Sequence, residues 1–116
     1  MDVYKRSYRL ALEVHQVAQQ MPKYERFELA SQLRRAAASI PLNIAEGYGR
    51  KESEAEFKHF LRNSLGSCNE VQVLLDMISD LSYIGQECYQ ELKSEYDVLG
   101  KQLNILIQRW TKRSNI

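Results

Sequence analysis

The segment "SEAEFKHFLRNSLGSCNEVQVLLDMI", residues 53–78, has the pattern of one long amphipathic helix and is the clearest indication of the fold class. Ser53 followed three residues later by Glu56 is a capping box, which predicts where the helix starts. Alternating spacings of three and four place one set of side chains on a single helical face, namely Phe57, Leu61, Ser64, Cys68, Val71, Leu75 and Ile78. Such a helix needs partners that cover its apolar face.

Three other segments supply those partners. Residues 3–20, residues 25–48 and the stretch from Gly85 to Trp110 show the same helical spacing, and Pro22 separates the first two. No stretch shows the alternation of a strand. Four amphipathic helices with short connections bury their faces most simply as an antiparallel up-down-up-down bundle. We therefore expect an all-α four-helix bundle that forms a single domain over residues 1–116.

A proline inside the second predicted helix indicates a kink. Pro41 cannot donate a hydrogen bond to the carbonyl of Ala37, which costs about 3 kcal/mol in an isolated helix. Ser39 and Asn43 flank the proline with short polar side chains, and these can satisfy backbone groups that the proline loosens. The sequence thus predicts a Pro-kinked second helix that bends around the core.

Small residues indicate that the second and third helices lie close together. In an antiparallel pair, Ala36–Ala38 fall near Leu65, Gly66 and Ser67, and short side chains on both helices allow their backbones to approach. Gly47 or Gly49 is the expected C-terminal cap of the second helix.

Composition places the chain among ordinary globular proteins. It has 116 residues and a formal net charge of +1, which does not indicate a histone-like or tail-like binder of nucleic acid. Cys68 and Cys88 stand at no metal-binding spacing and are expected to be reduced thiols. Neither a signal peptide nor a membrane-spanning run is evident, so we expect a soluble cytoplasmic protein without contact to a membrane.

The charge is predicted to separate along the bundle. The up-down-up-down course brings residues 1–10, 40–65 and 100–116 to one end, here called the basic pole, with eleven Lys and Arg against five Asp and Glu. The remaining residues carry a formal charge of −5. Complementing helix dipoles explains some of these cations, but not those at the start of the first helix. The expected nucleic-acid-binding residues are Lys5, Arg6, Arg9, Arg50, Lys51, Arg109, Lys112 and Arg113.

Some apolar residues fall outside the main helical faces. Scattered surface apolar residues are common, but several of these recur at a spacing of one heptad, which favours self-association. The predicted interface between copies comprises Leu10, Val17, Val73, Met77, Val98 and Ile105.

Three patterns resemble catalytic or cofactor sites and are rejected. Glu56 and His59 have the spacing of a dimetal carboxylate bundle, but a second such pair is missing. Arg9 and His15 approach the spacing of helical ribonucleases, yet six residues of continuous helix turn their side chains well apart. The glycines of residues 47–49 lack the strand and spacing of a phosphate loop. We expect no enzyme, no cofactor and no metal.

A resemblance to a known family extends over essentially the whole chain. It rests on the block "QLRRAAASIPLNIAEG", residues 32–47, and on the later segments "FLRNSLGSCNE" and "SDLSYI". The chain resembles the four-helix-bundle proteins encoded within intervening sequences of bacterial 23S ribosomal RNA genes. The residues that would form the family motif here are Arg35, Ser39, Ile40, Pro41, Asn43, Ala45, Glu46 and Gly47.

The resemblance implies a homopentamer without established enzymatic activity. A relative, the accessory variability protein of diversity-generating retroelements, is a pentameric barrel that binds nucleic acid and a reverse transcriptase. We therefore expect a non-catalytic homo-oligomer whose basic pole binds RNA or DNA. The alternative is a protein-interaction scaffold with no nucleic-acid role, which would hold a partner such as a reverse transcriptase or a ribosomal protein, for example at its acidic end.

Overall fold

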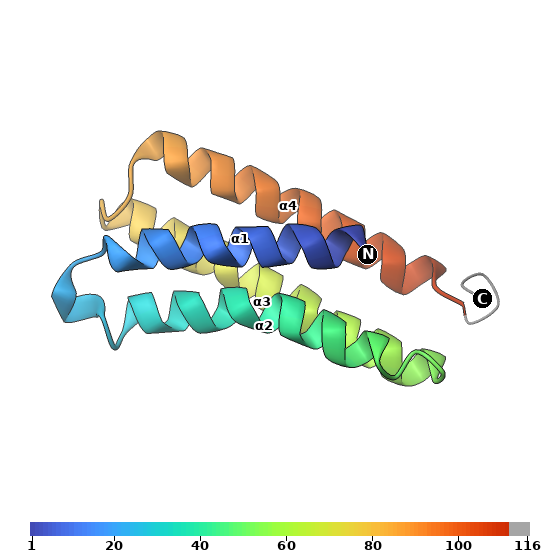
Figure 1. Ribbon diagram of the computed structural model, residues 1–116. Coiled ribbons are helices and arrows are strands. Elements are labelled where there is room, and N and C mark those ends of the chain that lie inside the picture. Colours follow the sequence, from blue (N-terminus) through green and yellow to red (C-terminus); the bar gives the residue numbers. More distant parts are fainter. Residues whose placement is uncertain (112–116) are drawn as a thin grey trace.

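A computed structural model describes residues 1–111 of the chain (Figure 1). Over this range the protein is all-helical and contains no strand. Its elements are α1 (Asp2–Gln19), a short 3-10 helix η1 (Lys23–Glu25), α2 (Leu29–Tyr48), α3 (Glu54–Asp80) and α4 (Gln86–Arg109). The prediction of an all-α protein with four helices is confirmed.

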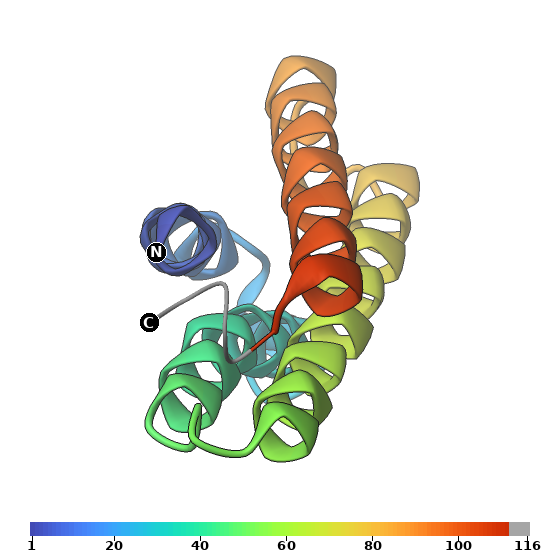
Figure 2. The same cartoon turned by 90° about the vertical axis from the view of Figure 1, so that its right-hand side faces the viewer.

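The helices form two diagonal pairs. Both α1 and α3 pack against α2 and α4, whereas α1 makes no close approach to α3. Seen from one end, α1 and α3 therefore occupy opposite corners of the bundle (Figure 2). Successive helices run back and forth along its length, and the α2–α3 turn lies toward the same end as the close of α4 (Figure 1).

The second helix begins later than the sequence indicates. The pattern predicts helix from residue 25, whereas α2 begins at Leu29 and η1 precedes it. Glu28 lies outside the helical region of backbone angles, with φ −111° and ψ −111°, so the chain changes direction there. The Glu25 side chain accepts a hydrogen bond from the Leu29 amide, which supports this change of direction.

Polar side chains contact the backbone around Pro41, which is buried within the continuous helix α2. The Asn43 side-chain amide donates to the Ser39 carbonyl at 2.8 Å, and the Ser64 hydroxyl donates to the Ile40 carbonyl at 2.9 Å. Hydrogen bonds to backbone groups next to the proline are therefore supplied from both α2 and α3. The kink itself stays a prediction.

The glycine that allows close packing is Gly47 and not Gly66. A β-carbon at Gly66 would meet no atom within 4 Å, so the predicted role of Gly66 in helix packing is wrong. A β-carbon at Gly47 would lie only 2.8 Å from the β-carbon of Phe60. Gly49 is the residue that caps α2. The expected pairing of α2 with α3 is nevertheless present, since the hydroxyls of Ser39 and Ser67 are in hydrogen-bond contact.

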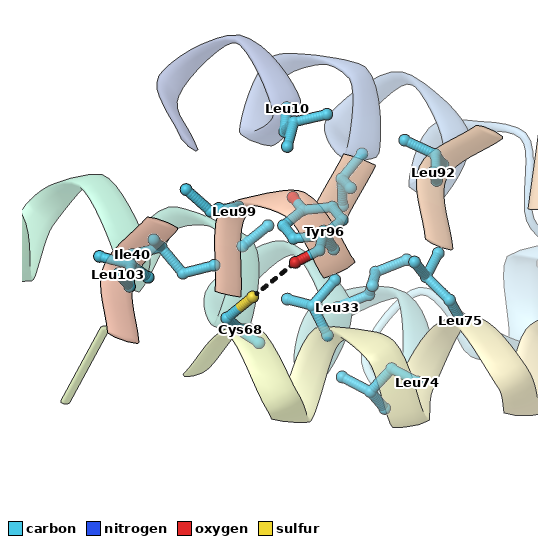
Figure 3. Packing of buried hydrophobic residues seen from close by; sticks show 14 of the residues in the cluster. Leu10, Leu33, Ile40, Cys68, Leu74, Leu75, Leu92, Tyr96, Leu99 and Leu103 are labelled. Carbon is cyan, nitrogen blue, oxygen red and sulfur yellow. Dashed lines mark hydrogen bonds between the residues drawn. The ribbon is translucent and has the colours of Figure 1, made fainter. Parts of the chain in front are cut away.

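All four helices contribute to one core (Figure 3). Its largest fully buried side chain is Tyr96 of α4, and the Cys68 thiol donates to the Tyr96 carbonyl at 3.2 Å. Burial raises the pKa of the Cys68 thiol to about 11, so the group stays protonated at neutral pH. Cys68 thus acts as a small core residue.

Candidate nucleic-acid interface

Two predicted bases follow the end of α2. The Arg50 guanidinium contacts the Glu46 carboxylate at 2.8 Å and the Glu56 carboxylate at 3.4 Å. These contacts raise the Arg50 pKa, chiefly through its hydrogen bond to Glu46. The Lys51 ammonium lies 4.1 Å from the centre of the Tyr48 ring and donates to the Tyr48 hydroxyl. Both cations are therefore held in place at the α2–α3 turn.

A second group of predicted bases lies in the groove between α1 and α4. Lys5, Arg6 and Arg9 line a hollow of about 340 Å³ together with Asp2 and Gln102. Asp2 and Gln102 also line an adjoining hollow of about 450 Å³, whose other lining residues include Arg109 and Trp110. The structure thus brings these four predicted bases around two hollows that share Asp2 and Gln102, here together called the α1–α4 groove.

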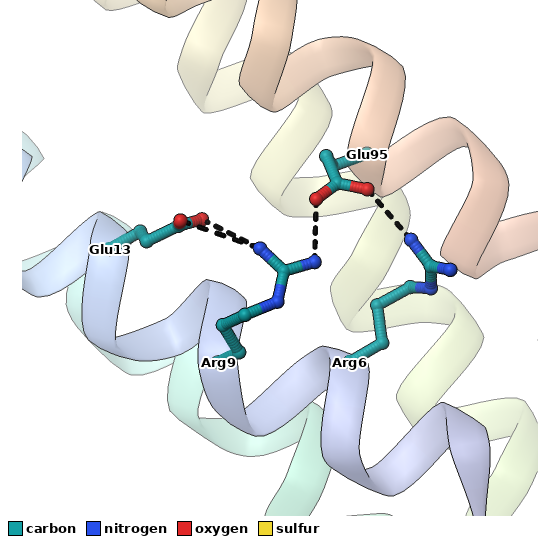
Figure 4. A network of polar contacts seen from close by, with 4 residues as sticks. All are labelled: Arg6, Arg9, Glu13 and Glu95. Atoms are coloured by element: carbon teal, nitrogen blue, oxygen red, sulfur yellow. Dashed lines mark hydrogen bonds and ion pairs between the residues drawn. The ribbon is translucent and has the colours of Figure 1, made fainter.

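Glu95 of α4 joins two of these bases (Figure 4). Its carboxylate accepts from Arg6 at 2.7 Å and also from Arg9, which in turn contacts Glu13. The hydrogen bond to Glu95 is the main cause that raises the Arg9 pKa. Glu95 lies outside the ranges predicted to form the basic pole, and its pairing with Arg6 and Arg9 depends on the register of α1 against α4, which the sequence of neither helix specifies.

The remaining predicted bases differ in their contacts. Among residues 1–111, Lys5 and Arg109 make no ion pair and both are exposed. Lys112 and Arg113 lie outside the described residues. The cations most available to a new anionic partner are therefore Lys5 and Arg109.

The charge is less cleanly divided along the bundle than the sequence predicts. Glu95, which lies outside the residue ranges of the basic pole, contacts Arg6 and Arg9. At the end opposite the α2–α3 turn, Lys23 and Arg26 lie in the connection between α1 and α2. Most acids outside the basic pole belong instead to α3 and α4. Charge therefore separates across the bundle as well as along it.

One predicted interface residue must be withdrawn. Leu10 is 0% exposed and belongs to the core of the subunit itself, because its row on α1 faces the other helices. Val17 is half-buried, packs against that core and lines a different hollow of about 740 Å³, whose other lining residues include Glu13 and Glu91. The other four predicted residues are exposed, which leaves them available to a second copy; they are Val73, Met77, Val98 and Ile105.

Most residues of the predicted motif have structural contacts. Ser39, Pro41, Asn43 and Gly47 lie where α2 meets α3 or adjust the backbone of α2, as described above. Glu46 holds Arg50, and the Arg35 guanidinium donates to the Ser31 hydroxyl at 3.0 Å. The residues of the motif therefore stabilise α2 and its packing against α3, and they do not gather into a binding site.

The residues of the rejected metal-site pattern make other contacts. Glu56 pairs with Arg50, and the His59 ring packs edge-on against Phe60. Within residues 1–111 no group of three or more His, Cys, Asp or Glu side chains could hold a metal ion. Nor is any helix of that range both long and apolar enough to cross a membrane.

Comparisons with known proteins agree with this architecture. The model of a family described as 23S rRNA-intervening sequence protein matches residues 1–105. The fold is similar to the crystal structure of a protein with unknown function from the S23 ribosomal protein family of Bacteroides thetaiotaomicron. That similarity has a TM-score of 0.83 and 24% sequence identity, and it covers 91% of this chain and 95% of that chain. No curated protein matches the chain.

Proposed function

The chain belongs to the 23S rRNA-intervening sequence protein family, and we propose that it is a non-catalytic homo-oligomer that binds nucleic acid, RNA above all, through its basic pole. The observation that carries the proposal is the α1–α4 groove, where Lys5, Arg6 and Arg9 line one hollow with Asp2 as its acid. Arg109 borders the adjoining hollow.

The groove suits phosphate groups better than base edges. Phosphate contacts from Lys and Arg supply most non-specific affinity for nucleic acid and release counterions. Glu95 holds Arg6 and Arg9 in fixed positions, but its carboxylate also competes with a phosphate for their N–H donors. We therefore expect modest affinity that falls steeply with salt and depends little on nucleotide sequence.

The first test measures binding of a structured RNA by gel shift over a range of salt concentrations. Lys5→Gln combined with Arg109→Gln should weaken binding and reduce the slope of log affinity against log salt by about two, since each lost phosphate contact removes about one. Glu95→Gln should strengthen binding, because it frees two guanidinium groups.

The control combines Arg35→Gln with Lys93→Gln, which removes the same formal charge outside the groove. It should leave the affinity almost unchanged. Equal weakening by both double variants would contradict an interface at the basic pole. If the wild-type protein binds no RNA at about 50 mM salt, the scaffold hypothesis replaces the nucleic-acid proposal.

Self-association is supported by exposed apolar faces on opposite corners of the bundle. Tyr4, Tyr8 and Leu12 follow one another along α1 at intervals of four residues, and Val73 and Met77 of α3 are followed at the same interval by Leu81, the residue that caps α3. Because α1 and α3 lie diagonally opposite, the α1 face of one copy can cover the α3 face of the next. Such head-to-tail contacts build a ring when the rotation closes, and the family resemblance implies five copies.

Met77→Glu should therefore reduce the native mass, because it places a charge within the apolar α3 face. Light scattering measures that mass directly. Leu42→Glu is the matched control, since Leu42 is 68% exposed on α2 and belongs to neither face. A wild-type mass of one subunit would contradict the proposed assembly.

A further inference from the structure

A second basic site lies away from the basic pole, where α1 ends and α2 begins. The pocket there, called the α1–α2 pocket, has a volume of about 410 Å³. This is within the range of roughly 300–1,000 Å³ that small-ligand sites occupy. Its lining residues are His15, Ala18, Gln19, Met21, Pro22, Lys23, Arg26 and Arg34.

All the Lys, Arg, Asp and Glu side chains that line this pocket are positively charged. Lys23, Arg26 and Arg34 line it, and no Asp or Glu does. None of the three makes an ion pair with another residue of the described range 1–111. Three neighbouring cations without a counter-charge repel one another, so a bound anion stabilises this arrangement.

The acid nearest in sequence is directed elsewhere. One oxygen of the Glu25 carboxylate accepts from the Tyr83 hydroxyl at 2.9 Å, and the other accepts from the Leu29 amide. Tyr83 follows α3, so Glu25 is held toward the α3–α4 turn. This explains why Glu25 does not neutralise the adjacent bases.

The arginines are also partly ordered before any ligand arrives. The Arg34 guanidinium donates one hydrogen bond to the Arg26 carbonyl at 3.3 Å, which fixes its position and leaves other N–H groups to donate. The Arg26 guanidinium lies 5.4 Å from the centre of the Phe27 ring. Planar guanidinium groups match the oxygens of a phosphate through paired hydrogen bonds.

We propose that the α1–α2 pocket binds a phosphate group through Lys23, Arg26 and Arg34, with His15 as a further hydrogen-bonding side chain. The phosphate comes either from a small phosphorylated molecule or from the backbone of a nucleic acid. The pocket lies at the end of the bundle opposite the α2–α3 turn. The proposal therefore holds whether or not the basic pole binds RNA.

The test follows backbone amide shifts by NMR while inorganic pyrophosphate, and separately a short single-stranded oligonucleotide, is added to the full chain. Amides of residues 15–34 should shift in the wild type. Arg34→Gln should weaken binding about tenfold, the loss expected for a charge-assisted hydrogen bond. Arg35→Gln is the matched control, because Arg35 is the next residue on α2 and does not line the pocket.

Each outcome is decisive. Shifts with pyrophosphate support a small phosphorylated ligand, and shifts with the oligonucleotide alone support a nucleic-acid backbone. If neither probe shifts these amides, or if Arg34→Gln and Arg35→Gln weaken binding equally, the proposal is overturned. The three bases would then complement the carboxyl end of α1.

Two further variants keep the result interpretable. Lys23→Gln removes a pocket charge in the connection outside both long helices, so it tests the pocket again if Arg34→Gln disturbs folding. Lys5→Gln with Arg109→Gln should leave pyrophosphate binding unchanged, because those residues lie in the α1–α4 groove. Failure of this proposal is thus distinguishable from failure of the proposal for the basic pole.

Discussion

Replacing Phe57 with alanine is expected to lower the free energy of unfolding by about 3–5 kcal/mol. Phe57 is fully buried in the first turns of α3. Its ring packs edge-on against Trp110, with centroids 4.4 Å apart, and more distantly against Tyr48. The substitution therefore opens a cavity where the end of α2, the start of α3 and the residue after α4 meet. Urea unfolding followed by circular dichroism measures the loss.

Phe27→Ala is the matched control for this prediction. Phe27 is 81% exposed, so the same chemical change should alter the free energy of unfolding by no more than about 0.5 kcal/mol. If Phe57→Ala costs as little as Phe27→Ala, the aromatic contacts at this end of the bundle do not contribute as the structure indicates.

Replacing Gly47 with valine is expected to cost at least about 2 kcal/mol, because the new side chain overpacks the interface between α2 and α3. A β-carbon there would lie 2.8 Å from the β-carbon of Phe60 and 3.1 Å from the ring of Phe57. It would also lie 3.3 Å from the Phe57 carbonyl oxygen, so backbone must shift as well as side chains. The midpoint of thermal unfolding should fall accordingly.

Gly66→Val separates packing from helix propensity. Gly66 also lies within a helix, but a β-carbon there meets nothing within 4 Å. Valine is a slightly better helix former than glycine, so this variant should be as stable as the wild type or slightly more stable. An equal loss at both positions would show that close packing at Gly47 is not the cause.

The candidate interface could be predicted from sequence only in part. The clustering of bases near the start of the first helix follows from composition and chain direction, and the structure does bring Lys5, Arg6 and Arg9 to one hollow. The partnership of Arg6 and Arg9 with Glu95 could not be foreseen. It depends on the rotation and axial offset of α1 against α4, which periodicity within one helix does not specify.

The four helices, their order and most of the core can be predicted from the sequence, because helical periodicity and capping are local properties of neighbouring residues. The packing of the helices against one another places Leu10 in the core and makes Gly47, not Gly66, the point where α2 and α3 come closest. This packing also brings Glu95 into contact with Arg6 and Arg9. It also gathered Lys23, Arg26 and Arg34 around one pocket. These facts depend on how whole helices rotate and slide against one another, and many small packing contacts summed over all four helices set that arrangement.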